Sequence, residues 1–308
     1  MTAAPPTTAP PGAAPSRTGR LGFYLPGTAM TILAMVMLGF VVHLTLVSHL
    51  QYARTQQTLY ADFRAELARG TAPVGQTRLE FVDGVAGDER IVEAGSPVAV
   101  LRVPAIGLRA VVLSGSDAEV LRDGPGHRRD TVLPGQPGTS VVMGRQAAYG
   151  GPFRDLDLLI PGDLITVVTG QGEHSYRVTT TRRPGDPTPP ALAAGGGRLT
   201  LITADGDRYL PRDVLRVDAD LVTPAQPVPA RRFGAGALPP AEQAMATDPD
   251  AWTPLMLWSQ ALLLATLAIA YLRTRWGGWP AWTVGVPLVA ALGGAAADQV
   301  ARLLPNLL

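Results

Sequence analysis

Three apolar stretches constrain what this sequence can fold into more than any other feature. They span 26–50, 252–272 and 281–304, and each is long enough to cross the roughly 30 Å hydrocarbon core of a membrane. The first is too long for the apolar region of a secretory signal peptide, which has about 7 to 15 residues, and it does not end in a small-residue cleavage site. We therefore predict three transmembrane helices and a chain held in the lipid bilayer.

Basic residues beside these stretches predict the orientation of the chain. Arg17 and Arg20 precede the first stretch, and Arg273 and Arg275 separate the last two. Because an excess of Lys and Arg marks the cytoplasmic side of a membrane, both places are expected to be cytoplasmic. The N-terminal tail over 1–25 is rich in Pro, Ala and Thr and is expected to be disordered. The part between the first and second helices then lies outside the cytoplasm.

A helical stalk is predicted directly after the first membrane helix, over 51–70. Leu59, Phe63 and Leu67 recur at a spacing of four, which places one apolar stripe along an otherwise polar helix. Gly70 is expected to end it, since glycine readily stops a helix.

The segment over 75–222 is predicted to form a single mainly β domain. Short apolar runs alternate with turns rich in Gly and Pro, a pattern typical of a small barrel or sandwich. The expected strands are 99–103, 110–113, 139–143, 164–169, 174–180, 199–203 and 213–221.

Two further expectations concern the C-terminal part. The Pro- and Ala-rich segment over 223–250 reads as a linker that leads back to the membrane. Asp298 and Arg302 lie four residues apart in the last apolar stretch and are expected to form an ion pair on one helical face.

Composition excludes several classes of function. The sequence contains no cysteine, which rules out disulfides, thiolate metal sites and a cysteine nucleophile. The formal net charge of +1 gives no basic face for a nucleic-acid partner. No metal site and no cofactor are expected.

One motif carries a family resemblance. Residues 124–153 read GPGHRRDTVLPGQPGTSVVMGRQAAYGGPF. This resembles sortases, and most closely the class E-like forms of high-GC Gram-positive bacteria, which show G-P-G-H-x-x-x-T-x-x-P-G-x-x-G, a strand, and then G-H-R-x-x-Y-G-x-P-F. The similarity continues over about 120 residues, through 161–163, 176–178 and 199–203. It implies a closed eight-stranded barrel whose groove binds a sorting-signal peptide at the cell surface.

The resemblance also implies a mechanism that this sequence cannot perform in the usual way. Sortases cleave the sorting signal with a Cys thiolate, use a His for proton transfer, and stabilise the oxyanion with an Arg. Here Arg145 stands at the His position, Ala204 at the Cys position and Arg212 at the Arg position. Alanine forms no thioester, and arginine is no general base near neutral pH. The sequence therefore predicts a pseudoenzyme.

An active acyl transferase with relocated residues is the alternative. Thr203 and Asp205 flank Ala204 and could act as nucleophiles, but strand alternation points both away from the side that Ala204 faces. No base at Arg145 would activate the threonine.

The candidate binding residues are those that the motif or the lost active site singles out: His127, Tyr149, Phe153, Arg145 and Arg212. His127 either touches a bound peptide or is a turn histidine that bonds the backbone of Gly126 or Thr131. His174 begins a strand and is expected to be exposed.

Arg145 and Arg212 are expected to lie close together at the old active site. Either Asp205 or Asp207 pairs with them, or an anionic ligand such as a carboxylate or phosphate lies between them. The expected partners of the whole chain are the bilayer and a sorting-signal peptide, or another membrane or cell-wall protein. A weaker alternative gives the membrane helices the main role.

Overall fold

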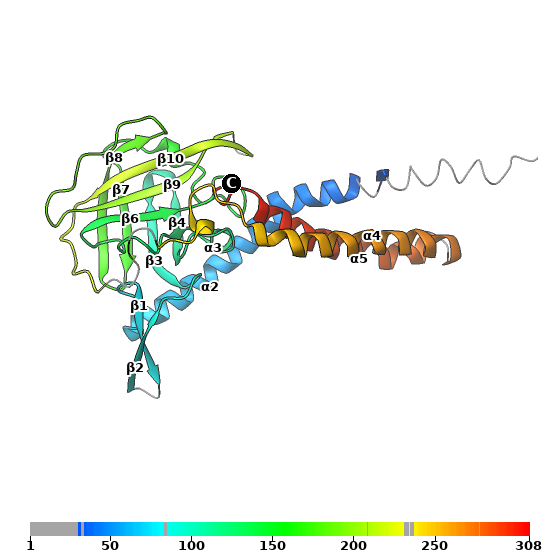
Figure 1. The fold of residues 1–308 in the computed structure, drawn as a ribbon, viewed down its shortest axis with the longest axis horizontal. Coiled ribbons are helices and arrows are strands. Elements are labelled where there is room, and N and C mark those ends of the chain that lie inside the picture. The colour runs from blue at the N-terminus through cyan, green and yellow to red at the C-terminus, as the bar shows by residue number, and fades with distance from the viewer. Residues whose placement is uncertain are drawn as a thin grey trace, which may run out of the picture.

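The computed structural model describes residues 30–31, 34–82, 85–207, 209–230, 234, 237–276 and 278–308. The tail over 1–25 and the first residues of the helix expected over 26–50 lie outside these ranges. Figure 1 shows a β-barrel from which a bundle of helices extends.

Within the described ranges, three helices are long and apolar enough to cross a membrane: Ala34–Arg69, Pro249–Leu272 and Thr283–Leu303. The first contains a π-helical stretch, η1 (His43–Val47), and continues as α2 (Ser48–Arg69). The second and third lie largely within α4 (Trp252–Trp276) and α5 (Gly278–Leu303). α4 leads away from the barrel and α5 returns to it (Figure 1).

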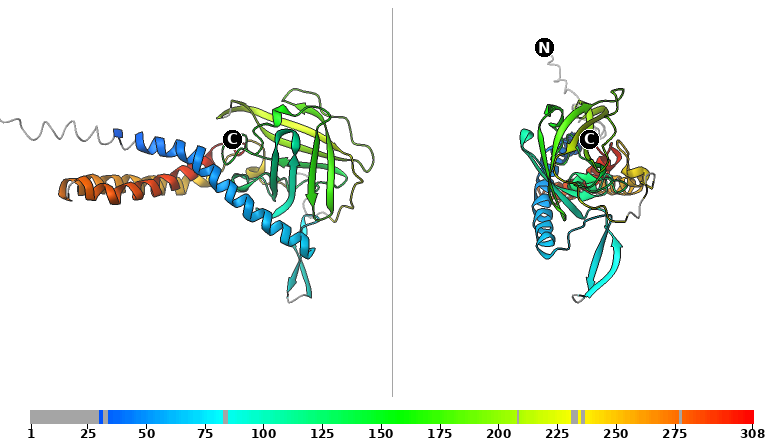
Figure 2. Two further views of the ribbon diagram at one scale, coloured as in Figure 1. Left: turned by 180° about the vertical axis from the view of Figure 1, so that it is seen from behind. Right: turned by 90° about the vertical axis from the view of Figure 1, so that its left-hand side faces the viewer.

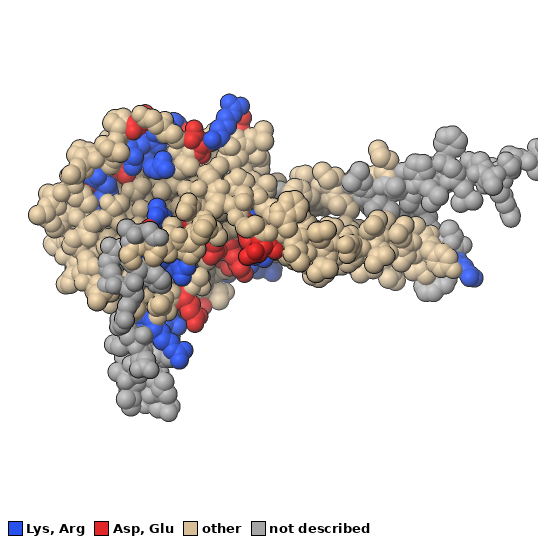
Figure 3. Space-filling view, viewed as in Figure 1, with Lys and Arg blue, Asp and Glu red and all other residues tan. Residues whose placement is uncertain are grey.

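The surface of these helices is suited to lipid. Leu257, Leu263 and Leu264 of α4 are exposed, and none of the most apolar window of the helix Pro249–Leu272 is buried. In Figure 3 the helices are free of charged side chains along most of their length, with basic atoms at the tip far from the barrel. Apolar surface of this extent marks a membrane contact.

The soluble part is a closed eight-stranded barrel with the strand order β10-β8-β7-β3-β4-β5-β6-β9. The pairs β4–β5 and β6–β9 are parallel, and the other six neighbours are antiparallel. The predicted fold class is confirmed. The strands are β3 (Pro97–Val103), β4 (Leu108–Ser114), β5 (Gly126–His127), β6 (Gly138–Met143), β7 (Leu164–Thr169), β8 (Gly172–Arg182), β9 (Gly197–Asp207) and β10 (Leu210–Leu221).

Smaller elements complete the chain. A two-stranded hairpin of β1 (Thr77–Val82) and β2 (Val85–Ile91), which was not predicted from the sequence, projects from the barrel in Figure 1. One short helix, α3 (Val120–Asp123), precedes β5. The 3-10 turns are η2 (Pro104–Ile106), η3 (Leu156–Leu158), η4 (Pro240–Glu242) and η5 (Pro249–Ala251).

Because side chains alternate along each strand, the barrel has an inner face that forms the main core and an outer face. Leu199 and Leu201 of β9 point into the main core, as does Leu215 of β10. Ile202 and Ala204 therefore face outward, because successive side chains of a strand point to opposite sides. This outward face positions the candidate site.

Helix α2 packs along the barrel instead of standing free of it (Figure 2). Phe63 is fully buried in a cluster with barrel residues of β3 and β4. The Gln56 side chain accepts a hydrogen bond from the Val111 backbone N–H (2.7 Å) and donates one to the Asp123 carbonyl (2.9 Å). Gly70 ends α2 with a left-handed φ of 68°.

Part of the segment expected to be a linker is docked on the barrel. The Ser116 hydroxyl donates to the Glu242 carbonyl (2.7 Å), and the buried Glu242 carboxylate forms an ion pair with Arg129. Pro- and Ala-rich composition gave no sign of this contact.

Candidate functional site

An apolar cluster on the outer face of the barrel surrounds Ala204, the position that the resemblance assigns to the nucleophile. Ala204 is 1% exposed. The cluster draws on α3, β6, β9, β10 and the end of the sequence, and its members are Leu121, Val141, Met143, Ile202, Ala204, Val214 and Leu307. A methyl group packed among aliphatic side chains offers no lone pair, so this position supplies no nucleophile.

Arg145, the position assigned to the histidine, lies two residues after β6 and is 2% exposed. Its guanidinium donates to the carbonyls of Leu121 (3.1 Å) and Ala118 (2.9 Å), and it lies 5.0 Å from the centre of the Tyr149 ring. Burial lowers the pKa of Arg145 to about 10, so the group stays charged near neutral pH. The Arg145 side chain therefore ties α3 to the loop after β6. Because it is already protonated near neutral pH, it cannot act as a base.

The expected ion pair of Arg145 with Asp205 or Asp207 is wrong. Asp205 accepts from Arg183 instead (2.9 Å), and among the described residues no carboxylate pairs with Arg145. The aromatic face and the carbonyl dipoles stabilise the buried cation in place of an anion.

Arg212 lies in a different environment. It is exposed and sits where the pairing of β10 with β9 is interrupted, between Pro211 and Asp213. Because Arg145 is buried beneath α3, it cannot share an anion from solvent with Arg212. The second alternative from the sequence, an anionic ligand held between the two arginines, therefore does not fit this arrangement.

Two further predicted binding residues have structural contacts here. Phe153 is fully buried in the main barrel core. Tyr149 is 1% exposed, has a φ of 49°, and donates its hydroxyl to the Asp298 carboxylate at 3.1 Å. Both side chains are shielded from solvent in this structure, and their role in binding stays a prediction.

Asp298 also differs from its expected role. The predicted pair with Arg302 is wrong, because Asp298 accepts from Arg122 (3.4 Å) and Tyr149, while Arg302 donates to Asp248 (2.6 Å). Asp298 and Arg302 therefore each bind a partner from a distant segment and not each other.

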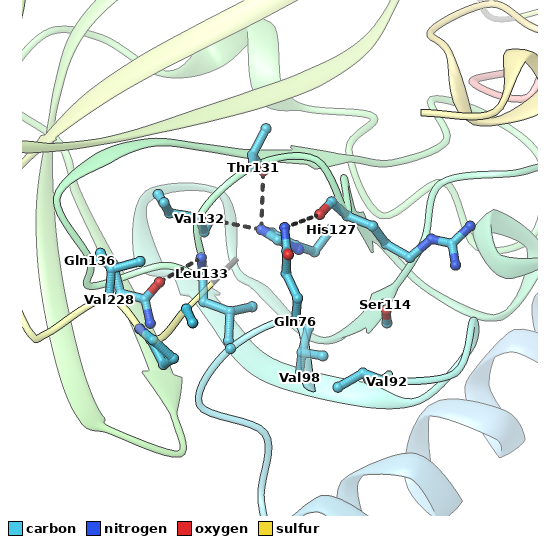
Figure 4. Close-up of a pocket in the computed structure, with 14 residues that line it drawn as sticks. Gln76, Val92, Val98, Ser114, His127, Thr131, Val132, Leu133, Gln136 and Val228 are labelled. Atoms are coloured by element: carbon cyan, nitrogen blue, oxygen red, sulfur yellow. Dashed lines mark hydrogen bonds between the residues drawn. The ribbon is translucent and has the colours of Figure 1, made fainter. Parts of the chain in front are cut away.

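His127 is buried in β5 beside a small cavity (Figure 4). Its Nε2 lies 2.8 Å from the Val132 carbonyl and 3.2 Å from the Thr131 hydroxyl. The ring therefore ties the loop that follows β5, close to the turn role considered from the sequence, although the backbone partner is Val132. The cavity is lined by residues such as Gln76, Ser114 and Gln136 and shares no residue with the Ala204 cluster.

His174 was expected to be exposed, and this is wrong. It lies inside β8, is 1% exposed, and its Nε2 is 3.2 Å from the Thr169 hydroxyl. Burial lowers the pKa of His174. The sequence places it three residues after the Gly170–Gln171 turn, but its pairing with Val167 of β7 places it on the inner face of the barrel.

One segment at the Ala204 cluster was not predicted from the sequence. The last four residues of the sequence, Pro305–Leu308 (the tail segment), run across it. The Leu307 carbonyl accepts from the Gln146 N–H (2.9 Å) and the Leu308 carbonyl from the Ala148 N–H (3.3 Å). The only sequence signal is a Leu-Leu pair that follows a helix-ending Pro-Asn.

Comparison with known proteins gives a consistent result. A family model described as the sortase domain matches residues 101–218. Sortase D of Bacillus subtilis is 29% identical over 90 residues, which make up 29% of this chain and 44% of that protein. The chain thus spans less than half the length of that relative.

Two solved structures are also similar. Sortase E from Streptomyces avermitilis has 32% sequence identity over 42% of this chain and 91% of that chain, with a TM-score of 0.37. A sortase D transpeptidase of Clostridium perfringens has 19% identity over 55% of this chain and 99% of that chain, with a TM-score of 0.42. The sortase-domain model runs from within β3 to within β10 and includes Ala204, and on this match the chain belongs to the sortase family.

Proposed function

We propose that this chain is a membrane-anchored, sortase-like pseudoenzyme that binds a peptide segment at the family's catalytic face without cleaving it. The observation that carries the proposal is the environment of Ala204, whose methyl group lies in a buried aliphatic cluster that also contains Leu307 from the last four residues of the sequence. Among the described residues, this cluster contains neither a nucleophile nor a base.

The position of the family's catalytic histidine, Arg145, also supplies no general acid or base. Arg145 is fully committed to two backbone carbonyls and an aromatic ring. A general base must exchange a proton with the reacting group, and a buried guanidinium that stays charged near neutral pH does not.

The alternative, an acyl transferase with relocated residues, has little support. Thr203 is 1% exposed and alternates onto the barrel side of β9, and Asp205 is held by Arg183. A nucleophile inside a closed barrel cannot reach a peptide on its outer face.

Three apolar helices support anchoring in a membrane. Arg273 and Arg275, in the last turn of α4, support a cytoplasmic location for the turn between α4 and α5, with the barrel outside. A sorting-signal peptide, or a membrane or cell-wall protein that presents one, is then the partner class that the family membership favours.

The test uses the full chain in lipid nanodiscs and fluorogenic sorting-signal peptides. We expect no cleavage by the wild type and no acyl-enzyme by mass spectrometry. An active sortase serves as the positive control for each peptide. Cleavage by the wild type would refute the proposal, and Thr203→Val and Asp205→Asn would then identify the group responsible.

A further inference from the structure

The tail segment Pro305–Leu308 occupies the candidate site through contacts along its whole length. It forms a turn in which the Leu308 N–H donates to the Pro305 carbonyl (3.0 Å). Asn306 and Leu307 are both fully buried, and Leu308 is nearly so. Loosely held chain ends are usually exposed, whereas three of the four side chains of this segment are buried, as they are in a bound peptide.

Leu307 fills the apolar part of the site. Its side chain belongs to the buried cluster that contains Ala204 and residues of α3, β6 and β10. Burial of a leucine side chain is one of the larger single contributions to binding, so this cluster is expected to supply much of the affinity.

Asn306 makes the polar part of the interaction. Its amide nitrogen donates to the carbonyls of Ser116 (3.0 Å) and Gln243 (2.9 Å), which belong to different segments. Two donors on one nitrogen are a property of a carboxamide, so a leucine or serine at this position could not make both bonds.

The backbone completes the match. Gln146 and Ala148 present N–H groups on alternate residues of one loop, and both donate to tail carbonyls. The Asn306 N–H in turn donates to the Ala246 carbonyl (2.9 Å). Main-chain bonds of this kind give affinity for any peptide, and the side-chain pockets select its sequence.

We propose that the Ala204 site is specific for a peptide in which a carboxamide residue precedes leucine, and that the chain's own tail segment is its resident, displaceable occupant. The site is thereby closed in cis until the tail segment leaves. This inference rests on the proposed function, because it names the ligand class and the regulation of the same site.

The test measures binding of a fluorescein-labelled Leu-Pro-Asn-Leu-Leu peptide to the full chain in nanodiscs. Leu307→Asp places a charge where only apolar groups lie and is expected to release the tail segment. The matched control is Leu158→Asp, at a leucine that is 65% exposed. We expect the Leu307→Asp chain to bind the peptide at least tenfold more tightly than the wild type or the control.

Two further arms locate the binding and its specificity. A Leu-Pro-Ala-Leu-Leu peptide is expected to bind about tenfold more weakly, because it lacks the two donated bonds. Adding Ala204→Trp to Leu307→Asp fills the pocket and is expected to abolish binding. Equal binding by wild type and Leu307→Asp, or equal binding of both peptides, would overturn the inference.

A crosslink keeps the inference testable even if Leu307→Asp fails to fold. Because the sequence has no cysteine, an Ala204→Cys/Leu307→Cys chain can form only one intramolecular disulfide, which mild oxidation is expected to produce. Ala204→Cys/Val222→Cys is the control, since Val222 lies eight residues beyond Val214, the partner of Ala204 in β10, and about 26 Å away at strand spacing. Absence of the first crosslink would refute the seated tail segment. Peptide cleavage by the wild type would refute only the absence of catalysis.

Discussion

The hydroxyl of Tyr149 donates a 3.1 Å hydrogen bond to the carboxylate of Asp298, and this bond joins the loop after β6 to helix α5. Arg122 of α3 donates to the same carboxylate at 3.4 Å. Three segments that are distant in the sequence therefore meet at one acid, where the barrel adjoins the membrane helices. The barrel and helices are expected to move as one body.

Removing the Tyr149 hydroxyl tests this coupling. Tyr149→Phe should lower the free energy of unfolding by about 1 kcal/mol, because a partly buried hydrogen bond is lost. A cycle with Asp298→Asn should return a coupling energy of about 0.5 to 1.5 kcal/mol in denaturant unfolding of the solubilised chain. Tyr209→Phe, at a side chain that is 50% exposed, is the control and should have no measurable effect. A coupling near zero would mean that the contact contributes nothing to the docking.

The two arginines that the family pattern singles out should respond very differently to the same substitution. Arg145→Met leaves the carbonyls of Leu121 and Ala118 without their donor, which should destabilise the chain by about 1 to 3 kcal/mol. The release of a buried charge offsets part of this loss. Arg212→Met changes an exposed side chain and should shift stability by less than about 0.5 kcal/mol. Thermal unfolding of both variants decides the matter, and equal melting temperatures would contradict a structural role for Arg145.

His174 predicts a pH dependence of stability. Its pKa in the folded chain is lowered by burial, so the unfolded chain binds a proton at a pH where the folded chain does not. Stability is therefore full above the unfolded value of about 6.5 and falls as the pH drops below it, by at most about 1.4 kcal/mol per pH unit. His174→Gln should flatten this decline in melting temperature. Thr169→Val, which removes the hydrogen-bond partner but keeps the histidine, should lower stability without removing the decline.

The sequence predicted the parts of this molecule that depend on local pattern. Short apolar runs between Gly- and Pro-rich turns predicted strands that overlap β9 and β10, and glycine's tendency to stop a helix predicted the end of the stalk at Gly70. Strand alternation also predicted that Thr203 and Ala204 point to opposite sides of β9. These features depend on neighbours within a few residues.

The predictions that were wrong depend on contacts between distant segments. Asp298 and Arg302 have the right spacing for a helical pair. In the structure, however, Asp298 accepts a hydrogen bond from Tyr149, and Arg302 donates to Asp248. His174 was judged by its polarity, whereas the register of β7 and β8 turns it inward. The two-residue strand β5 was too short to show any periodicity.

Docking of α2 on the barrel should depend on Phe63. Phe63→Ala removes a fully buried ring from the cluster with β3 and β4 and should destabilise the chain by about 3 to 5 kcal/mol. Hydrogen exchange should show faster exchange in α2 with little change in β9. Leu158→Ala, at an exposed leucine, is the matched control. Unchanged exchange in α2 would mean that the helix is held by its other contacts, among them those of Gln56.

The chemical state of a thiol at position 204 gives the most direct view of the site. Ala204→Cys introduces the only thiol of the sequence, at a position that is 1% exposed and lined by aliphatic groups. Such an environment disfavours the thiolate, so maleimide should label this cysteine far more slowly than a Tyr209→Cys control. If the tail segment is what covers it, adding Leu307→Asp should bring the labelling rate close to that of the control. Fast labelling of Ala204→Cys alone would show an open groove, and the tail segment could then not be its resident occupant.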